Sequence, residues 1–298
     1  MKKSAMTLRA IWVLGLLVAY SGGLQCQEAD KPLVLQEISW TDVEEYLKSN
    51  DMVIIPLGST EQHGPHLPLG TDYYEAMGVA KIISARTGVL VAPVLFSGYS
   101  VYHSGFPGTL SLKPETMEQV LFETTELLIK YGFRKFMFFN YHGGNRVVEQ
   151  KVIHRINHTT EAVAVAIGYG ASFQGYEPIQ GADYDAHAGI GETSLMLYFH
   201  PDLVKLERAK RPRLTNTPQM KRLQKLIRED PELRDVLDAL RYVPEETGKG
   251  GASHQMSSNG IFSSENPKKA TSEQGKEQAF RMAERAATFI EAWKKVKR

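Results

Sequence analysis

Short apolar runs and amphipathic stretches alternate along the chain. Apolar runs of strand length occupy residues 52–57, 89–95, 135–140 and 162–167, as expected for strands buried on both faces. Helical periodicity lies between and after them, at residues 40–49, 73–87, 114–131, 143–158 and 191–199. Thr41 is the expected N-cap of the first of these helices. The alternation predicts an α/β fold, a layered α/β/α arrangement with a mostly parallel central sheet.

The stretch after residue 205 differs in composition from the rest of the chain. It is rich in Lys, Arg and Leu, with helical periodicity at residues 219–228 and 232–240 and a Gly- and Ser-rich loop at 248–260. We interpret residues 205–260 as a helical excursion of a single domain that spans residues 27–298, closed by a helix at 273–294. The basic side chains are expected on a solvated helix face.

The N-terminus has the layout of a secretory signal. Basic residues precede an apolar run at residues 10–19, and small or polar residues follow it. We therefore predict a signal peptide at residues 1–26, which is too short to span a bilayer stably. Cys26 is the only cysteine, so an intramolecular disulfide and a catalytic thiol in the body of the protein are excluded. Lipidation of Cys26 is the weaker alternative to secretion or periplasmic export, because Gln25 is a poor match to a lipoprotein signal.

Charge excludes one class of partner. The 298 residues contain 35 Lys and Arg against 34 Asp and Glu. Nucleic-acid binding usually requires a basic excess on one face, so no nucleic-acid partner is expected.

The densest polar motif follows the first apolar run, at residues 58–72. Residues two apart in an extended loop point the same way, so Glu61 and His63 can project into one pocket while Gln62 points elsewhere. Asp72, at the start of the next helix, offers two oxygens that could bridge two cations. Mixed imidazole and carboxylate ligands suit zinc, manganese or iron rather than calcium. Hydrogen-bonded loop and cap residues are the alternative interpretation.

A second motif, at residues 140–145, follows the third apolar run. Its paired glycines let the backbone approach closely and turn His142 toward the mouth of a pocket. A phosphate cradle is the competing interpretation, but the full P-loop or dinucleotide pattern is missing. Gly168 and Gly170 also resemble a dinucleotide turn, although Phe173 stands where its third glycine belongs.

The third motif, at residues 183–194, combines acids with an imidazole. Glu192 falls in the first turn of a helix, and His187 precedes it as a candidate proton shuttle. His103 and Ser104, in a glycine-rich turn, are expected on the substrate side. A structural role for His103 stays open, since a lone histidine in such a turn is more often structural.

Together these motifs resemble those of the creatininase family of amidohydrolases, over essentially the whole mature chain. The resemblance includes the Glu61–Gly64 run, the Phe106–Thr109 turn, His142–Asn145, His187–Gly189 with Glu192–Ser194, and the late segments 259–262 and 270–275. It implies a creatininase-like layered fold, a homo-oligomer such as a hexamer, and two divalent metal ions. Glu61, Asp72 and His142 would hold one metal, and His63 and Asp72 would reach the other.

The sequence departs from the creatininase pattern in two places. Creatininase takes a further metal ligand from a glutamate two residues after its equivalent of His142, where this chain has Gly144. Glu192 is the replacement that charge and expected proximity favour, and we count it as both a metal ligand and a catalytic residue. Creatinine-cleaving members use tryptophans in the loop before His187, where this chain has other aromatic residues, among them Tyr176 as a substrate-binding candidate.

The predicted activity follows from these ligands. Two cations bridged by Asp72 would generate a bridging hydroxide that attacks a cyclic amide, a formamide or a similar C–N bond of a small molecule. His187 would then protonate the leaving nitrogen. Two alternatives remain: a two-metal hydrolase of another bond, such as a phosphate ester or a modified peptide, and a non-catalytic metal- or ligand-binding protein.

Overall fold

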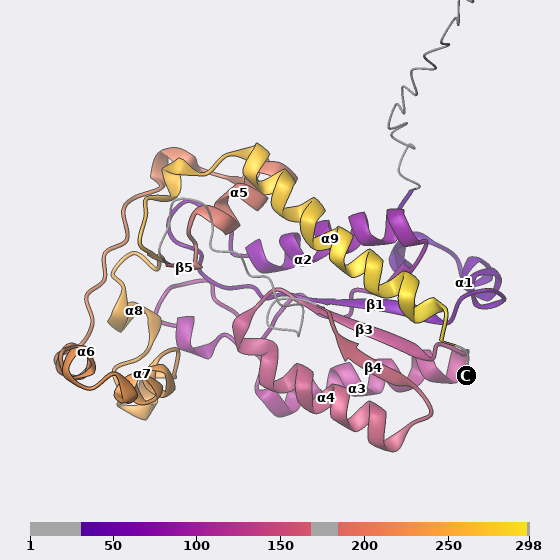
Figure 1. Cartoon of the computed structure of the whole chain (residues 1–298), viewed down its shortest axis with the longest axis horizontal. Coiled ribbons are helices and arrows are strands. Elements are labelled where there is room, and N and C mark those ends of the chain that lie inside the picture. Colours follow the sequence, from indigo (N-terminus) through magenta and orange to yellow (C-terminus); the bar gives the residue numbers. More distant parts are fainter. Residues whose placement is uncertain (1–30, 168–183, 297–298) are drawn as a thin grey trace, which may run out of the picture.

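A four-stranded parallel sheet forms the centre of the molecule (Figure 1). The strand order is β2–β1–β3–β4, and every neighbouring pair is parallel, as the sequence predicts. The strands are β1 (Met52–Leu57), β2 (Leu90–Val91), β3 (Lys135–Asn140) and β4 (Val163–Ala166). All six side chains of β1 are buried, because helices cover both faces of the sheet.

The structure is a computed structural model that describes residues 31–167 and 184–296. The predicted signal peptide at residues 1–26 and Tyr176 lie outside the described residues. No helix in the described part of the chain is both long enough and apolar enough to cross a membrane.

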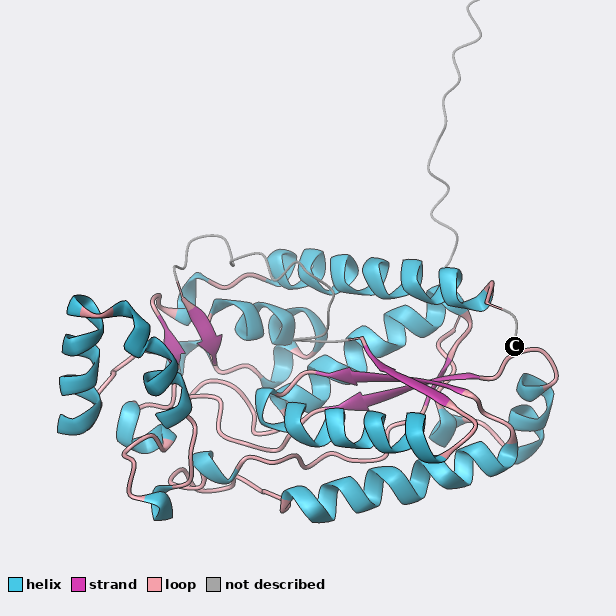
Figure 2. Ribbon diagram, turned by 60° about the horizontal axis from the view of Figure 1, so that its bottom comes forward, coloured by secondary structure: helices cyan, strands magenta, loops and turns pink. Residues whose placement is uncertain are grey.

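Helices form a layer on each side of the sheet, so the predicted α/β/α layering is confirmed (Figure 2). Met52 and Ile54 of β1 point into one core, and Val53, Ile55 and Leu57 point into the other. The first core packs against α2 (Thr71–Thr87), α5 (Ile190–Phe199) and α9 (Ser272–Lys294). The second packs against α1 (Trp40–Leu47), α3 (Pro114–Tyr131) and α4 (Arg146–Thr159).

The register of the sheet brings two of the polar motifs together. Leu57, the last residue of β1, is paired with Asn140, the last residue of β3. The loops that follow these strands therefore leave the same edge of the sheet, where ligand sites of parallel sheets usually lie. One loop leads to α2, and the other passes through a 3-10 turn at Gly143–Asn145 into α4.

Two local predictions were wrong. The N-cap of α1 is Ser39 rather than Thr41, because Ser39 and Asp42 form a capping box that satisfies two backbone N–H groups. The strand expected at residues 89–95 contains only Leu90–Val91, since Pro93 lacks the N–H that would continue the ladder. Leu95 still forms one isolated parallel bridge, with Leu57.

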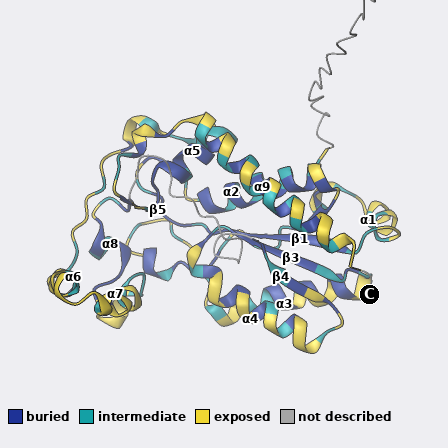
Figure 3. Ribbon diagram, viewed as in Figure 1, coloured by how far each residue is buried: buried dark blue, intermediate teal, exposed yellow. Residues whose placement is uncertain are grey.

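The excursion contains α6 (Pro218–Glu229), α7 (Arg234–Leu240) and α8 (Ser253–Met256), the last inside the expected Gly- and Ser-rich loop. These helices enclose a small apolar cluster centred on Met220, Leu237, Met256 and Phe262. The outer surfaces of α6 and α7 are largely exposed, which agrees with the expected solvated face (Figure 3). A separate two-stranded antiparallel sheet pairs β5 (Asp185–His187), which precedes the excursion, with β6 (Phe262–Ser263), which follows it.

Candidate metal centre

The loop between β1 and α2 is fixed by backbone hydrogen bonds. The amide of Glu61 donates to the carbonyl of Leu69 at 2.8 Å, and the carbonyl of Thr60 accepts from Leu110 at 2.8 Å. Glu61 and His63 are completely buried, although both are ionisable. Such burial is costly unless a partner compensates the charge. Their side chains therefore belong to a built polar site rather than to a solvated loop.

Asp72 lies between two imidazoles. Its Oδ1 is 3.1 Å from His63 Nε2, and its Oδ2 is 3.1 Å from His142 Nδ1. The hydroxyl of Ser59 also donates to Oδ2 at 2.9 Å. Because α2 begins at Thr71, two residues earlier than expected, Asp72 is held within its first helical turn. The bridging position predicted for Asp72 is therefore present in the geometry.

Backbone carbonyls set the tautomers of both imidazoles. His63 Nδ1 lies 3.1 Å from the carbonyl oxygen of Glu61, and His142 Nε2 lies 3.0 Å from that of Tyr99. A carbonyl oxygen can only accept, so these nitrogens carry the protons. The opposite nitrogens, His63 Nε2 and His142 Nδ1, face Asp72. A lone pair that faces a carboxylate at 3.1 Å requires a proton or a cation between the two.

The buried acids and imidazoles of the cluster shift one another's pKa values. Burial alone would lower the pKa of His63, but the carboxylates of Asp72 and Glu192 raise it to about 10. Likewise Glu61 and Asp72 outweigh burial and raise the pKa of His142 to about 9. Burial raises the pKa of Glu61 to about 7, although His142 opposes the shift. The cluster thus favours positive charge between its carboxylates and imidazoles.

Glu192 reaches the same cluster from α5. It lies in the first turn of that helix, as predicted, and its Oε2 lies 3.7 Å from His63 Nε2. The amide of Ala188, a residue with a left-handed backbone at φ 51°, donates to the Glu192 carboxylate. Asp185 caps the helix by accepting from the amides of Ile190 and Gly191 at 3.1 and 2.8 Å. Burial raises the pKa of Glu192 to about 8, against the effect of His63.

The position of Gly144 cannot accept a side chain. A Cβ built there would lie 2.2 Å from the carbonyl oxygen of Tyr99 and 2.5 Å from the hydroxyl of Tyr102. Tyr102 is buried, and its hydroxyl lies 3.2 Å from His142 Nε2. A glutamate side chain at this place is therefore excluded by packing. Glu192 is the carboxylate that approaches His63 instead.

Gln62 connects two further histidines. His187 Nε2 lies 2.7 Å from the backbone carbonyl of Gln62, and the side-chain Nε2 of Gln62 lies 3.0 Å from His103 Nδ1. His187 therefore carries its proton on Nε2. Its Nδ1 is unprotonated, with a lone pair, and lies 3.7 Å from Glu61 Oε1. Burial and the neighbouring His63 hold the pKa of His187 well below its usual range. The side chain of Gln62 contacts His103 and His187, so this residue positions two imidazoles of the site.

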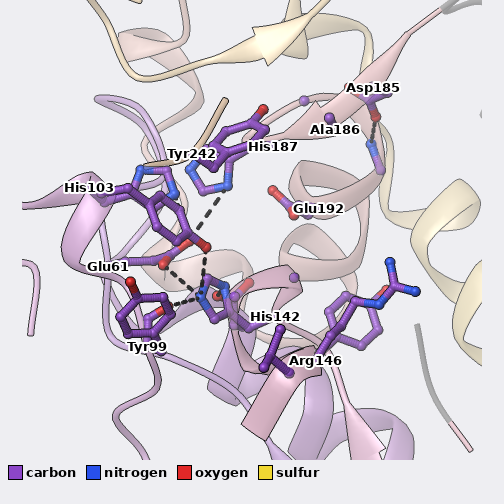
Figure 4. A pocket seen from close by; sticks show the side chains of 18 of the residues that line it. Glu61, Tyr99, His103, His142, Arg146, Asp185, Ala186, His187, Glu192 and Tyr242 are labelled. Atoms are coloured by element: carbon purple, nitrogen blue, oxygen red, sulfur yellow. Dashed lines mark hydrogen bonds and ion pairs between the residues drawn. The ribbon is translucent and has the colours of Figure 1, made fainter. Parts of the chain in front are cut away.

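A cavity of about 420 Å³ opens onto this cluster (Figure 4). Glu61, Asp72, His142, His187 and Glu192 line it, whereas His63 lies behind this wall. His103 lines the cavity as predicted and stacks on His187, with ring centroids 4.5 Å apart. Ser104 is exposed and does not belong to the lining.

Several lining residues were not predicted from the sequence. Tyr102 and Tyr242 pack edge to face, with centroids 5.7 Å apart, and Tyr242 comes from the excursion. Arg146 lines the cavity from the start of α4. No sequence pattern identifies Tyr242, because the rings that it contacts in the site, Tyr102 and His103, lie far away along the chain. The position of Arg146 directly after the Gly143–Asn145 turn was a usable signal.

The donor set fits divalent metal ions. Both carboxylate oxygens of Glu61 are buried and accept no well-formed hydrogen bond among the described residues, although His103 Nε2 and His142 Nε2 each lie 3.3 Å from one of them. Three sets of ligand atoms lie within 4.8 Å of one another: Glu61–His63–Asp72, His63–His187–Glu192 and Glu61–His103–His187. His142 is outside these sets, although its Nδ1 faces Asp72. Mixed imidazole and carboxylate donors match zinc, manganese or iron.

Known proteins resemble the chain in sequence and in fold. A mycofactocin precursor peptide peptidase from Mycolicibacterium smegmatis is 39% identical over 160 residues, which is 51% of this chain and 59% of the relative. The chain thus spans less than two thirds of that relative. A creatinine amidohydrolase from Pseudomonas putida is 31% identical over 198 residues, covering 60% of this chain and 76% of the relative.

A solved structure of manganese creatininase has the same fold. It covers 89% of this chain and 100% of its own, with a TM-score of 0.65 at 22% identity. The family model of creatininase, described as creatinine amidohydrolase, matches residues 36–290, which include every described residue of the metal centre. The chain therefore belongs to the creatininase family.

Proposed function

We propose that this chain is a metal-dependent amidohydrolase that hydrolyses a cyclic amide, a formamide or a similar C–N bond of a small molecule. The observation that carries the proposal is Asp72, whose two oxygens each face an imidazole lone pair at 3.1 Å. Two cations can share this carboxylate, with Glu61 and His142 on one side and His63 and Glu192 on the other. Such a pair, when bound, lowers the pKa of a shared water and polarises the amide carbonyl.

The other groups of the site have complementary tasks. The cavity wall formed by Tyr102, His103 and Tyr242 limits the access of water and orients a planar amide. His187 is neutral at rest, because burial depresses its pKa, and its Nδ1 faces the cavity side of Glu61. It can therefore accept a proton on Nδ1 and return it to the leaving nitrogen. Gln62 keeps this imidazole in the required tautomer through its backbone carbonyl.

The metal dependence is tested on the purified full chain. We expect about two equivalents of zinc, manganese or iron by elemental analysis, loss of amidase activity on chelation, and recovery when one of these metals is added. Zinc suits the ligand set best. Full activity in protein shown to be metal-free would refute the proposal.

The bond that is cleaved is tested with a substrate panel. It contains lactams, N-formyl amino compounds, short peptides and p-nitrophenyl phosphate, each with the metal-loaded chain. Turnover of a lactam or a formamide is the expected result. Hydrolysis of the phosphate ester alone would favour the alternative two-metal hydrolase, and binding of amides without turnover would favour a ligand-binding protein.

We also propose that the protein is exported to the periplasm or secreted, after removal of a leader at residues 1–26. The order of basic, apolar and small residues supports this proposal. N-terminal sequencing of the mature protein should begin between residues 22 and 27. A mature chain that begins at residue 1 would contradict export.

A homo-oligomer, such as a hexamer, is the proposed assembly, and the family resemblance supports it. Light scattering coupled to size-exclusion chromatography measures the mass directly. A mass equal to one chain of 33.4 kDa would exclude it.

A further inference from the structure

One positively charged side chain lines the cavity that contains the candidate metal centre. Arg146 is the only Lys or Arg among the described residues that line it, and the carboxylates of Glu61, Asp72, Asp185 and Glu192 line the same space. In Figure 4, Arg146 lies at the opposite side of the pocket from His103. The cavity therefore has a positively charged rim at one end and a ligand cluster beyond it.

The side chain of Arg146 has no polar partner among the described residues. Within residues 31–167 and 184–296 its guanidinium makes no hydrogen bond and no ion pair. The carboxylate on which it acts electrostatically, Glu149, is buried on the same helix and lies 3.4 Å from the amide nitrogen of Asn140. An exposed guanidinium with five donors is thus available at the rim.

Its position on the helix is electrostatically unfavourable. Arg146 is the first residue of α4, a 14-residue helix, so its charge lies at the positive end of the helix dipole. Arginine is usually stabilising at the other end of a helix. A bound anion would interact favourably with the guanidinium and the helix end at once. This placement favours a ligand over a role in stability.

Neutral polar groups stand beside the guanidinium. Tyr141 and Gln278 line the same cavity, and the amide nitrogen of Gln278 lies 3.4 Å from the Tyr141 hydroxyl. Val147, which is 63% exposed, adds an apolar surface next to Arg146. A carboxylate with a short aliphatic stem matches this combination, because a planar guanidinium binds carboxylates in a bidentate manner.

We propose that Arg146 forms a subsite for a substrate carboxylate, so that the amides hydrolysed here are those with a free carboxylate a few atoms from the scissile bond. The inference rests on the proposed function, since it places the scissile bond at the metal centre. It narrows the substrate class from amides in general to acidic amides.

The test uses monohydroxamates of dicarboxylic acids with one to four methylene groups, each paired with its uncharged carboxamide analogue. The hydroxamate group of each compound binds the metal. The series of chain lengths covers the distance from the metal centre to Arg146. Acetohydroxamate, which has no carboxylate, reports on the metal centre alone. Binding to the metal-loaded full chain is measured by isothermal titration calorimetry. The variants are Arg146→Gln and, as a matched control, Lys151→Gln, which removes an exposed charge from α4 outside the cavity.

We expect the best acid of the series to bind the wild type and Lys151→Gln roughly 10- to 100-fold more tightly than its carboxamide. Arg146→Gln should lose that preference and keep the affinity for acetohydroxamate. No preference for the acid in the wild type, or a preference that survives in Arg146→Gln, would overturn the inference and leave the metal centre intact. If no hydroxamate binds the metal-loaded chain at all, the proposed function itself fails.

Discussion

Replacement of Gly144 by alanine is the sharpest test of the packed environment around His142. The backbone at Gly144 does not have a positive φ, so conformation alone does not require glycine. The added Cβ would lie 2.2 Å from the carbonyl oxygen of Tyr99, 2.5 Å from the Tyr102 hydroxyl and 2.6 Å from His142 Nε2. The first atom belongs to the backbone, the second to a side chain that contacts His142, and the third to the imidazole of His142 itself. The strain must therefore displace His142.

Two quantities should change in Gly144→Ala. Overpacking of a closely packed site costs about 1–3 kcal/mol of unfolding free energy. Loss of the groups that orient a metal-binding histidine lowers metal affinity by roughly 10- to 100-fold. Urea unfolding of the metal-free chain measures the first quantity, and competition with a chromogenic chelator measures the second.

Gly143→Ala is the matched control. It adds the same methyl group one residue earlier, where no atom lies within 4 Å of the new Cβ. Its stability and metal affinity should stay close to those of the wild type. If Gly144→Ala behaves like Gly143→Ala in both assays, the packing account of the missing glutamate is wrong.

Four further predictions concern single groups of the site and its support. Burial raises the pKa of Glu149 to about 7 from 4.5, so the native protein retains a proton that the unfolded chain loses. Between pH 4.5 and 7 the wild type should lose about 3 kcal/mol more stability than Glu149→Gln, measured by urea unfolding at pH 5 and 8. Glu192→Gln should bind about one metal equivalent less than the wild type by elemental analysis, and unchanged stoichiometry would remove Glu192 from the ligand set. His187→Ala should retain both metals and lose about 10²- to 10⁴-fold in kcat on the best amide of the panel; an unchanged kcat would assign the proton transfer elsewhere. Gln62→Leu should retain the metals but lower kcat at least about 10-fold, because the support of His103 is removed; wild-type kinetics would show that this support is dispensable.

The central fold could be predicted from the sequence because its signals are local. The apolar runs of β1 and β3 end at Leu57 and Asn140, where polar motifs begin, and the structure gives both strands the predicted bounds. Helix α3 begins at Pro114 and ends before Gly132, two residues that mark helix ends from sequence alone. The misplaced cap of α1 was decided by Ser39 and Asp42, which satisfy the same backbone N–H groups that Thr41 was expected to cap, and the shortened β2 by the missing N–H of Pro93.

The acids and imidazoles of the candidate metal centre could also be predicted. Most of them directly follow strands whose carboxyl ends lie at the same edge of the sheet. Asp72, His142 and Glu192 converge as the sequence indicated. The residues that position these acids and imidazoles could not be predicted. Gln62 was expected to point elsewhere, yet its carbonyl and amide hold two histidines that are 41 and 125 residues away along the chain. Such contacts depend on tertiary packing, which leaves no periodic trace in the sequence.

The antiparallel bridge between Leu214 and Ser257 has a consequence for how this protein can diversify. It pins together the two ends of a segment that contains α6 and α7 and has an apolar cluster of its own. Of the described cavity-lining residues, only Tyr242 comes from that segment. Residues 214–257 could therefore be exchanged as a unit. Such an exchange would change the entrance of the cavity near Tyr242, while the carboxylates that line the cavity would keep their positions.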